Sequence, residues 1–161
     1  MKTLILATLL ALASIGAMAS DPSVERGRSI ALESGCVACH TPNGASSPER
    51  NWLTGNTTGQ LGPWGTTYAS NLRVSLSRMS EDTWVRYAKA LKVREPMPAD
   101  AMKHLREDEL RAFYRYVRAA GVAGAQVPYA MAPGELPPAP FVAYPGAIEH
   151  TGQANYSVAR R

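Results

Sequence analysis

Two cysteines and a histidine stand close together in the segment Gly35-Cys36-Val37-Ala38-Cys39-His40-Thr41, and the chain has no other cysteine. Two thiols at this spacing can add across the two vinyl groups of a haem. The imidazole that follows them is then placed beneath the iron as an axial ligand. The C-x-x-C-H pattern therefore predicts one covalently bound haem c, attached through Cys36 and Cys39, with His40 as an iron ligand.

Other uses of paired cysteines explain this segment less well. A redox dithiol of the thioredoxin type usually sits in a strand–helix pattern, and no strand pattern precedes Cys36. A zinc site needs further ligands, and there is neither a second cysteine pair nor a second histidine nearby. A structural disulfide would leave His40 without a role. Haem attachment is the interpretation that uses all three residues.

The N-terminus has the features of an export signal. A single lysine, Lys2, precedes an apolar run from Leu4 to Ile15, and Ala17-Met18-Ala19 fits the small-x-small cleavage pattern. The run is too short to span a membrane comfortably, which takes about 20 apolar residues. We therefore expect residues 1–19 to be a signal peptide. After its cleavage we expect a periplasmic protein without a membrane span.

Composition and periodicity predict one small, all-α domain over residues 20–127. Apolar residues recur at helical spacing from Pro22 to Ser34, from about Glu81 to Leu91 and from about Glu107 to Ala120, whereas residues 41–65 have a loop composition. So small a domain has a thin core, which a haem would complete. The net charge is +4, and because the basic residues are scattered, no nucleic-acid partner is expected.

The end of the chain, residues 128–161, is rich in proline, which argues against regular helix or sheet. Its apolar side chains, including Tyr129, Met131, Phe141 and Tyr144, are unusual for a solvated linker. We expect an extended strap along the domain as far as about Pro145, followed by a loose tail.

With these residues placed, the chain resembles the class I cytochromes c. It is most similar to a bacterial branch of single-haem cytochromes, akin to the cytochrome domains of membrane-associated alcohol and gluconate dehydrogenases. The segments that carry the resemblance are Val24-Glu25-Arg26-Gly27-Arg28-Ser29-Ile30, Pro63-Trp64-Gly65-Thr66-Thr67-Tyr68-Ala69-Ser70-Asn71-Leu72, Met79-Ser80-Glu81-Asp82-Thr83-Trp84, Pro96-Met97-Pro98 and Glu107-Asp108-Glu109-Leu110-Arg111-Ala112-Phe113-Tyr114. The resemblance implies cytochrome c-like helices packed around one haem. It also implies that Gly27 lets the last helix cross closely, against Phe113, Tyr116 or Val117.

The resemblance also implies a methionine as the second axial ligand, supplied by the loop before the last helix. Met97 stands there between two prolines, which stiffen the backbone. Met102 and His104 are the alternatives in the same loop. The metal ligands expected are therefore His40 and Met97.

Weaker expectations concern the surroundings of the haem. The resemblance suggests that the Pro63 carbonyl accepts a hydrogen bond from the His40 ring, which would orient the imidazole. It also suggests that Trp64, Tyr68 and Asn71 reach the haem propionates. Core packing or turn formation would explain each of these three residues equally well.

These features predict an electron carrier rather than an enzyme. The expected partners are redox proteins that bind transiently, with a periplasmic dehydrogenase as donor and a respiratory protein as acceptor. A dedicated electron-accepting subunit of a molybdenum or quinoprotein dehydrogenase complex is the alternative. A haem enzyme or gas sensor would need an open axial position, which carbon monoxide binding would reveal.

Overall fold

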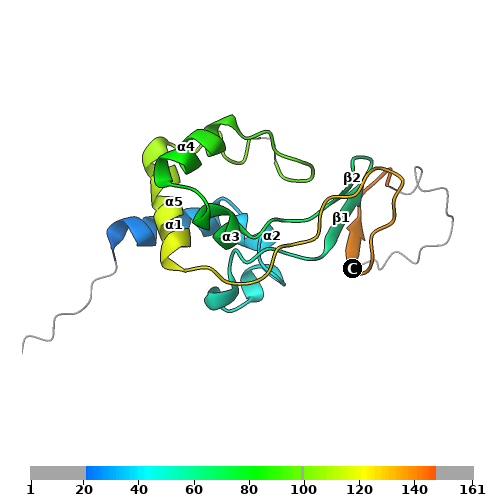
Figure 1. Ribbon diagram of the computed structural model, residues 1–161, viewed down its shortest axis with the longest axis horizontal. Helices are drawn as coiled ribbons and strands as arrows, with labels where there is room; N and C mark the ends of the chain where they lie inside the picture. Colours follow the sequence, from blue (N-terminus) through cyan, green and yellow to red (C-terminus); the bar gives the residue numbers. More distant parts are fainter. Residues whose placement is uncertain (1–20, 99, 148–161) are drawn as a thin grey trace, which may run out of the picture.

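The computed structural model describes residues 21–98 and 100–147, with helices at one end and a small sheet at the other (Figure 1). The expected signal peptide, residues 1–19, lies outside this range, as does the tail from residue 148. In the described residues, none of the helices has the length and apolar character that crossing a membrane requires.

The first helix, α1, spans Pro22–Glu33 and confirms the helix expected before the cysteine motif. Asp21 caps it, since the Asp21 carboxylate accepts a hydrogen bond from Ser23 N–H at 2.8 Å. Gly35, at φ = 71°, ends the turn that follows. The single-turn helix α2, Cys36–Cys39, begins directly after it.

Two further helices also form where periodicity predicted them. Helix α4 spans Glu81–Ala90, and the Ser80 hydroxyl caps it by accepting from Thr83 N–H at 3.2 Å. Helix α5 spans Glu107–Ala119. Although Arg106 is a poor capping residue, its N–H donates to the Glu109 carboxylate at 3.0 Å, which satisfies one group at the start of α5.

The core forms where α1 crosses α5. A Cβ atom on Gly27 would fall 2.6 Å from the Ala112 carbonyl carbon and 2.7 Å from Tyr116 Cβ, so only glycine allows this approach. Tyr116 is thus the aromatic neighbour, one of the three residues expected there. The largest fully buried apolar side chains of this helical core are Phe113, Ile30, Leu53, Leu76, Leu110, Val37 and Val117.

The stretch from the motif to α4 is more regular than its composition indicated. It contains two 3₁₀ turns, η1 at Gly44–Ser46 and η2 at Glu49–Asn51, and a short helix, α3, at Leu72–Ser77. Asn71 caps α3 by accepting from Val74 N–H at 3.0 Å. Six residues are too few for a helical repeat to show in the sequence, which is why α3 was not predicted.

A three-stranded sheet corrects the all-α prediction. Its strands are β1 (Gly59–Gly62), β2 (Gly65–Thr67) and β3 (Phe141–Ala143), in the order β2-β1-β3. β1 pairs antiparallel with β2, and parallel with β3.

The expectation that prolines exclude sheet after residue 127 was therefore wrong. β3 is an edge strand, and Pro140 stands just before it, where a missing N–H costs nothing. The Pro140 carbonyl even accepts from Gly59 N–H at 3.0 Å. The chain between α5 and β3 runs back across the molecule to the sheet (Figure 1). On the way Met131 exchanges two backbone hydrogen bonds with Thr66, at 3.1 and 2.9 Å.

Candidate functional site

The two thiols lie on the single turn of α2. Both are free, Cys36 half-buried and Cys39 exposed. Burial raises the pKa of the Cys36 thiol to about 11. A redox dithiol needs a thiol with a lowered pKa, because the thiolate is the reactive form. The surroundings of Cys36 therefore disfavour a thioredoxin-like role.

The His40 ring is held by one backbone carbonyl. His40 Nδ1 lies 2.8 Å from the carbonyl oxygen of Ser70. A carbonyl can only accept, so the contact places the proton on Nδ1 and leaves the lone pair on Nε2, the tautomer that binds a metal through Nε2. Burial lowers the pKa of His40, despite the opposing effect of this hydrogen bond. The ring is therefore neutral at pH 7, as a ligand must be.

Ser70 provides this carbonyl in place of Pro63, which corrects the sequence-based expectation. Pro63 is exposed at the turn between β1 and β2. Ser70, in contrast, lies immediately before the capping residue of α3, where the chain returns to the motif. A backbone acceptor leaves no mark on residue type, so no sequence signal distinguished Ser70.

The motif is also fixed to the chain that follows it. The His40 carbonyl accepts from Gly55 N–H at 2.8 Å. The buried Thr41 hydroxyl accepts from Leu53 N–H at 3.0 Å. These bonds fix the backbone at His40 and Thr41, and the Ser70 contact fixes the orientation of the His40 ring.

The three candidates for the second axial position have different surroundings. Met97 is half-buried and packs against the edge of the core. Met102 is only 6% exposed and belongs to the core itself. The side chain of His104 is 78% exposed, and its Nε2 lies 2.8 Å from a carboxylate oxygen of Asp100. Of the two methionines, Met97 is therefore the one whose side chain is only partly buried.

Trp64 presents a donor without a partner. Within the described residues, Trp64 Nε1 and Thr66 Oγ1 are both buried and make no hydrogen bond. Both residues line a cavity of about 300 Å³, which Arg94 and Glu95 also line. Buried donors left unpaired are costly, so Trp64 Nε1 and Thr66 Oγ1 would gain from an acceptor such as a haem propionate, and the Arg94 guanidinium would balance the charge of Glu95 or of that acceptor. Thr66 and Arg94 were not among the residues predicted from the sequence.

Tyr68 and Asn71 are engaged by the protein instead. The Asn71 amide donates to the carbonyls of Ala123 at 2.8 Å and Ala125 at 3.1 Å, so both its hydrogens are used. The Tyr68 hydroxyl points to the sulfur of Met131, at 3.9 Å. The structure thus gives Asn71 a role in capping α3 and holding the segment after α5, rather than one at a propionate.

The described residues also bear on the zinc alternative. Among residues 21–98 and 100–147, no group of three or more histidine, cysteine or acidic side chains is arranged to hold a metal ion. A cofactor that brings its own four nitrogen ligands needs only axial groups from the protein, and His40 and Met97 are the residues predicted for that role. Several side chains that pack against the core remain partly exposed, and they include Cys36 and Met97: Val24, Cys36, Leu72, Leu91, Met97, Leu105 and Tyr114.

The chain also matches a known protein family. The family model described as "Cytochrome c" matches residues 24–121, which include the motif, Met97 and α5. The chain belongs to the cytochrome c family. Proteins of this family bind haem c covalently and carry electrons rather than catalyse reactions. Neither the curated proteins nor the solved structures that were searched contain a match to this cytochrome.

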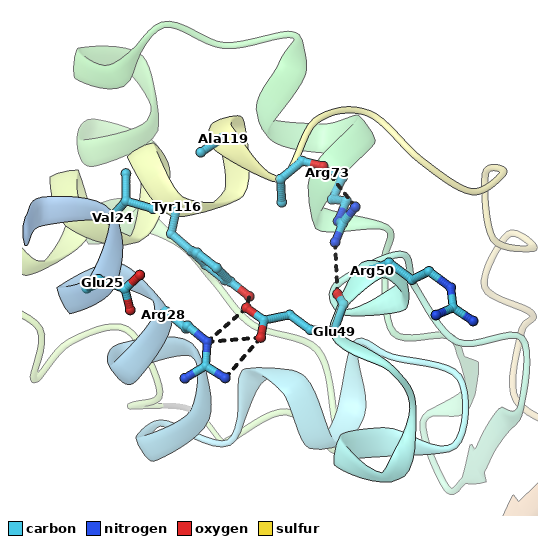
Figure 2. A pocket seen from close by; sticks show the side chains of 9 residues that line it. Val24, Glu25, Arg28, Glu49, Arg50, Arg73, Tyr116 and Ala119 are labelled. Carbon is cyan, nitrogen blue, oxygen red and sulfur yellow. Dashed lines mark hydrogen bonds and ion pairs between the residues drawn. The ribbon is translucent and has the colours of Figure 1, made fainter. Parts of the chain in front are cut away.

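A second cavity, of about 340 Å³, is lined by none of the predicted haem residues (Figure 2). The Glu49 carboxylate in it accepts from the Arg28 guanidinium at 2.8 Å and from the Tyr116 hydroxyl at 3.0 Å. The buried Arg73 donates to the carbonyls of Glu49 and Ala120. These bonds link η2 to α1, α3 and α5, so the polar groups of this cavity tie the helices together.

Proposed function

We propose that this cytochrome carries single electrons in the periplasm through a haem ligated by His40 and Met97. The observation that supports this most is the hydrogen bond from the His40 ring to Ser70. It orients the ring and selects the tautomer with a free Nε2. The motif at residues 36–40 alone would permit covalent attachment of a haem, whereas this hydrogen bond leaves Nε2 of His40 free to bind its iron.

Each residue has a defined task in this proposal. Cys36 and Cys39 would hold the haem by thioether bonds, and His40 and Met97 would be the two protein ligands of its iron. The bound iron supplies one-electron chemistry by cycling between Fe(III) and Fe(II). A thioether ligand raises the reduction potential relative to a second histidine. With both axial positions filled, no substrate can bind at the metal. Trp64 donates to a propionate through its free Nε1.

The proposed location and partners rest on the sequence. The pattern of residues 1–19 supports export and cleavage after Ala19, giving a mature chain of a domain over residues 20–127 and a C-terminal segment over residues 128–161. A periplasmic dehydrogenase is the proposed donor and a respiratory protein the acceptor. Shuttling requires encounters that are brief, with interfaces below about 1,200 Å².

Mass spectrometry and two methionine variants test the proposal. The mature protein should have the mass of residues 20–161 plus one haem, and the haem should resist acid–acetone extraction. A His/Met haem in the ferric state gives a weak sulfur-to-iron absorption near the red edge of the visible spectrum. Met97→Leu should abolish this band and lower the reduction potential. Met102→Leu should keep it and cost less than about 1.5 kcal/mol, as a volume-conserving change in the core. The reverse pattern would make Met102 the ligand, and extractable haem would reject covalent attachment.

Exposed apolar side chains on the C-terminal segment favour a second candidate, a dedicated subunit of a dehydrogenase complex. Tyr129 is 87% exposed and Val142 51%. Such side chains are common where a partner docks. Copurification of a stoichiometric dehydrogenase from the native host would support the subunit, whereas elution as a single chain would support the shuttle.

A further inference from the structure

The segment that carries Met97 has little structure of its own. Residues 92–105 join α4 to α5 and contain neither helix nor strand in their described part. The backbone hydrogen bonds of that part are short-range turns, such as the one from Met97 N–H to the Arg94 carbonyl at 3.0 Å. These turns shape the segment but cannot fix its distance from the rest of the protein.

Contacts with other elements hold the segment on both sides of Met97. After it, Met102 is buried in the core, only 6% exposed. Before it, the Thr67 hydroxyl donates to the Glu95 carbonyl at 2.6 Å, across 28 residues of sequence. In the described part of residues 92–105, this is the one hydrogen bond to another element. It acts on the residue just before Pro96, whose ring restricts the backbone that leads to Met97.

We propose that Thr67 is a positioning residue for Met97, which it holds toward the haem by tying Glu95 to the end of β2. The inference rests on the proposed role of Met97 as iron ligand. Thr67 acts through the backbone and does not touch the iron. Loss of its hydroxyl leaves the segment held only by apolar packing, chiefly that of the buried Met102, so the segment opens more often by local unfolding. The usual net contribution of a hydrogen bond corresponds to an open population about three- to tenfold larger.

Replacement of Met97 by imidazole on the ferric protein measures this opening directly. The iron–sulfur bond of Met97 breaks and an iron–nitrogen bond to imidazole forms, with no change in oxidation state. At saturating imidazole the rate reports dissociation of Met97. Thr67→Val removes the hydroxyl at nearly constant shape and should raise this rate about three- to tenfold. Thr67→Ser keeps the hydroxyl and should behave as wild type.

Thr54→Val is the matched control, because the Thr54 hydroxyl donates to the Asn51 carbonyl at 2.7 Å, away from the Met97 segment. It should leave the imidazole rate unchanged. Equal acceleration by Thr54→Val, or no acceleration by Thr67→Val, would overturn the proposal. Hydrogen exchange of the Met97 amide gives a second readout and should speed up in Thr67→Val alone.

The proposed roles of Met97 and Thr67 can be rejected separately. A wild-type protein that lacks the sulfur-to-iron band would reject Met97 as the ligand, and the role of Thr67 with it. A wild-type protein that has the band, with a Thr67→Val rate equal to that of wild type, would reject the role of Thr67 alone. Thermal unfolding by far-ultraviolet circular dichroism will show that the variants are folded when the rates are compared.

Discussion

Replacing Gly27 with alanine should destabilise the protein, although alanine is the better helix former. Gly27 is in the middle of α1, where the change alone would gain about 1 kcal/mol of helix propensity. The added Cβ, however, would overlap the carbonyl group of Ala112 and lie 2.7 Å from Tyr116 Cβ. The Ala112 carbonyl belongs to the backbone of α5 and has no rotamer by which to move away.

The size of the effect follows from the distances. The Cβ would lie 2.6 Å from the Ala112 carbonyl carbon, and ordinary contacts begin near 3.4 Å. The helices must therefore move apart by roughly 1 Å, which forfeits a quarter to a half of the dispersion energy at the atoms that separate. Overpacking of this kind costs up to about 3 kcal/mol. Because the gain in helix propensity offsets about 1 kcal/mol of this cost, the free energy of unfolding should fall by about 2 kcal/mol. This corresponds to a fall in Tm of roughly 10 °C.

Thermal unfolding of the haem-loaded protein, followed by far-ultraviolet circular dichroism, measures this loss. Ser29→Ala on the same helix is the control, because it changes helix propensity without adding a side-chain atom, and it should shift the free energy of unfolding by no more than about 0.5 kcal/mol. A Gly27→Ala protein with an unchanged or higher Tm would refute the reasoning. It would mean that the crossing of α1 and α5 relaxes at almost no cost.

Two other substitutions examine the polar contacts. Trp64→Phe should lower the reduction potential by no more than about 60 mV, because a propionate without its hydrogen-bond donor exerts a stronger negative field on the iron. An unchanged potential in a spectroelectrochemical titration would reject the proposed hydrogen bond between Trp64 Nε1 and the propionate. Glu49→Gln should lower stability at pH 7 by less than about 1 kcal/mol, since the Arg28–Glu49 pair is partly exposed. Arg28 lowers the pKa of Glu49 in the folded protein. The stability that the ion pair contributes is therefore fully present above the pKa of Glu49 in the unfolded chain, and it is lost as the pH falls through the lower pKa of the folded protein. In urea titrations, the difference between the two proteins should therefore begin to shrink as the pH falls below about 4, and a constant difference down to pH 3 would contradict this origin.

The helices that the sequence predicted are those with strong local signals. α1 and α4 have capping side chains at Asp21 and Ser80, and α5 repeats apolar residues over more than three turns. The sheet had no such signal. β1 gains its partner β3 from the far end of the chain, so the pairing depends on contacts that no local window of sequence contains. The prolines around β3 then suggested irregular structure.

Within the site too, some features have a local sequence signal and others depend on the fold. The C-x-x-C-H motif is compact, because thioether chemistry itself demands adjacent residues, and it could be identified without the fold. The acceptor for the His40 ring is a backbone carbonyl, which any residue can provide, and only the folded chain brings Ser70 to it. Thr67 is likewise an ordinary surface residue type, and the role proposed for it depends on the fold, which places the Glu95 carbonyl within reach of its hydroxyl.

The return of the chain to the β1–β2 hairpin has a consequence for solubility. A two-stranded hairpin is marginally stable and presents two edges of unpaired backbone groups. Here the segment after α5 covers both: β3 pairs with β1 on one side, and Met131 bonds to Thr66 of β2 on the other. The proline-rich composition makes this covering segment itself a poor template for further strands. The last described residues thus protect the hairpin against edge-to-edge aggregation, and a chain cut after Val127 would expose both edges at once.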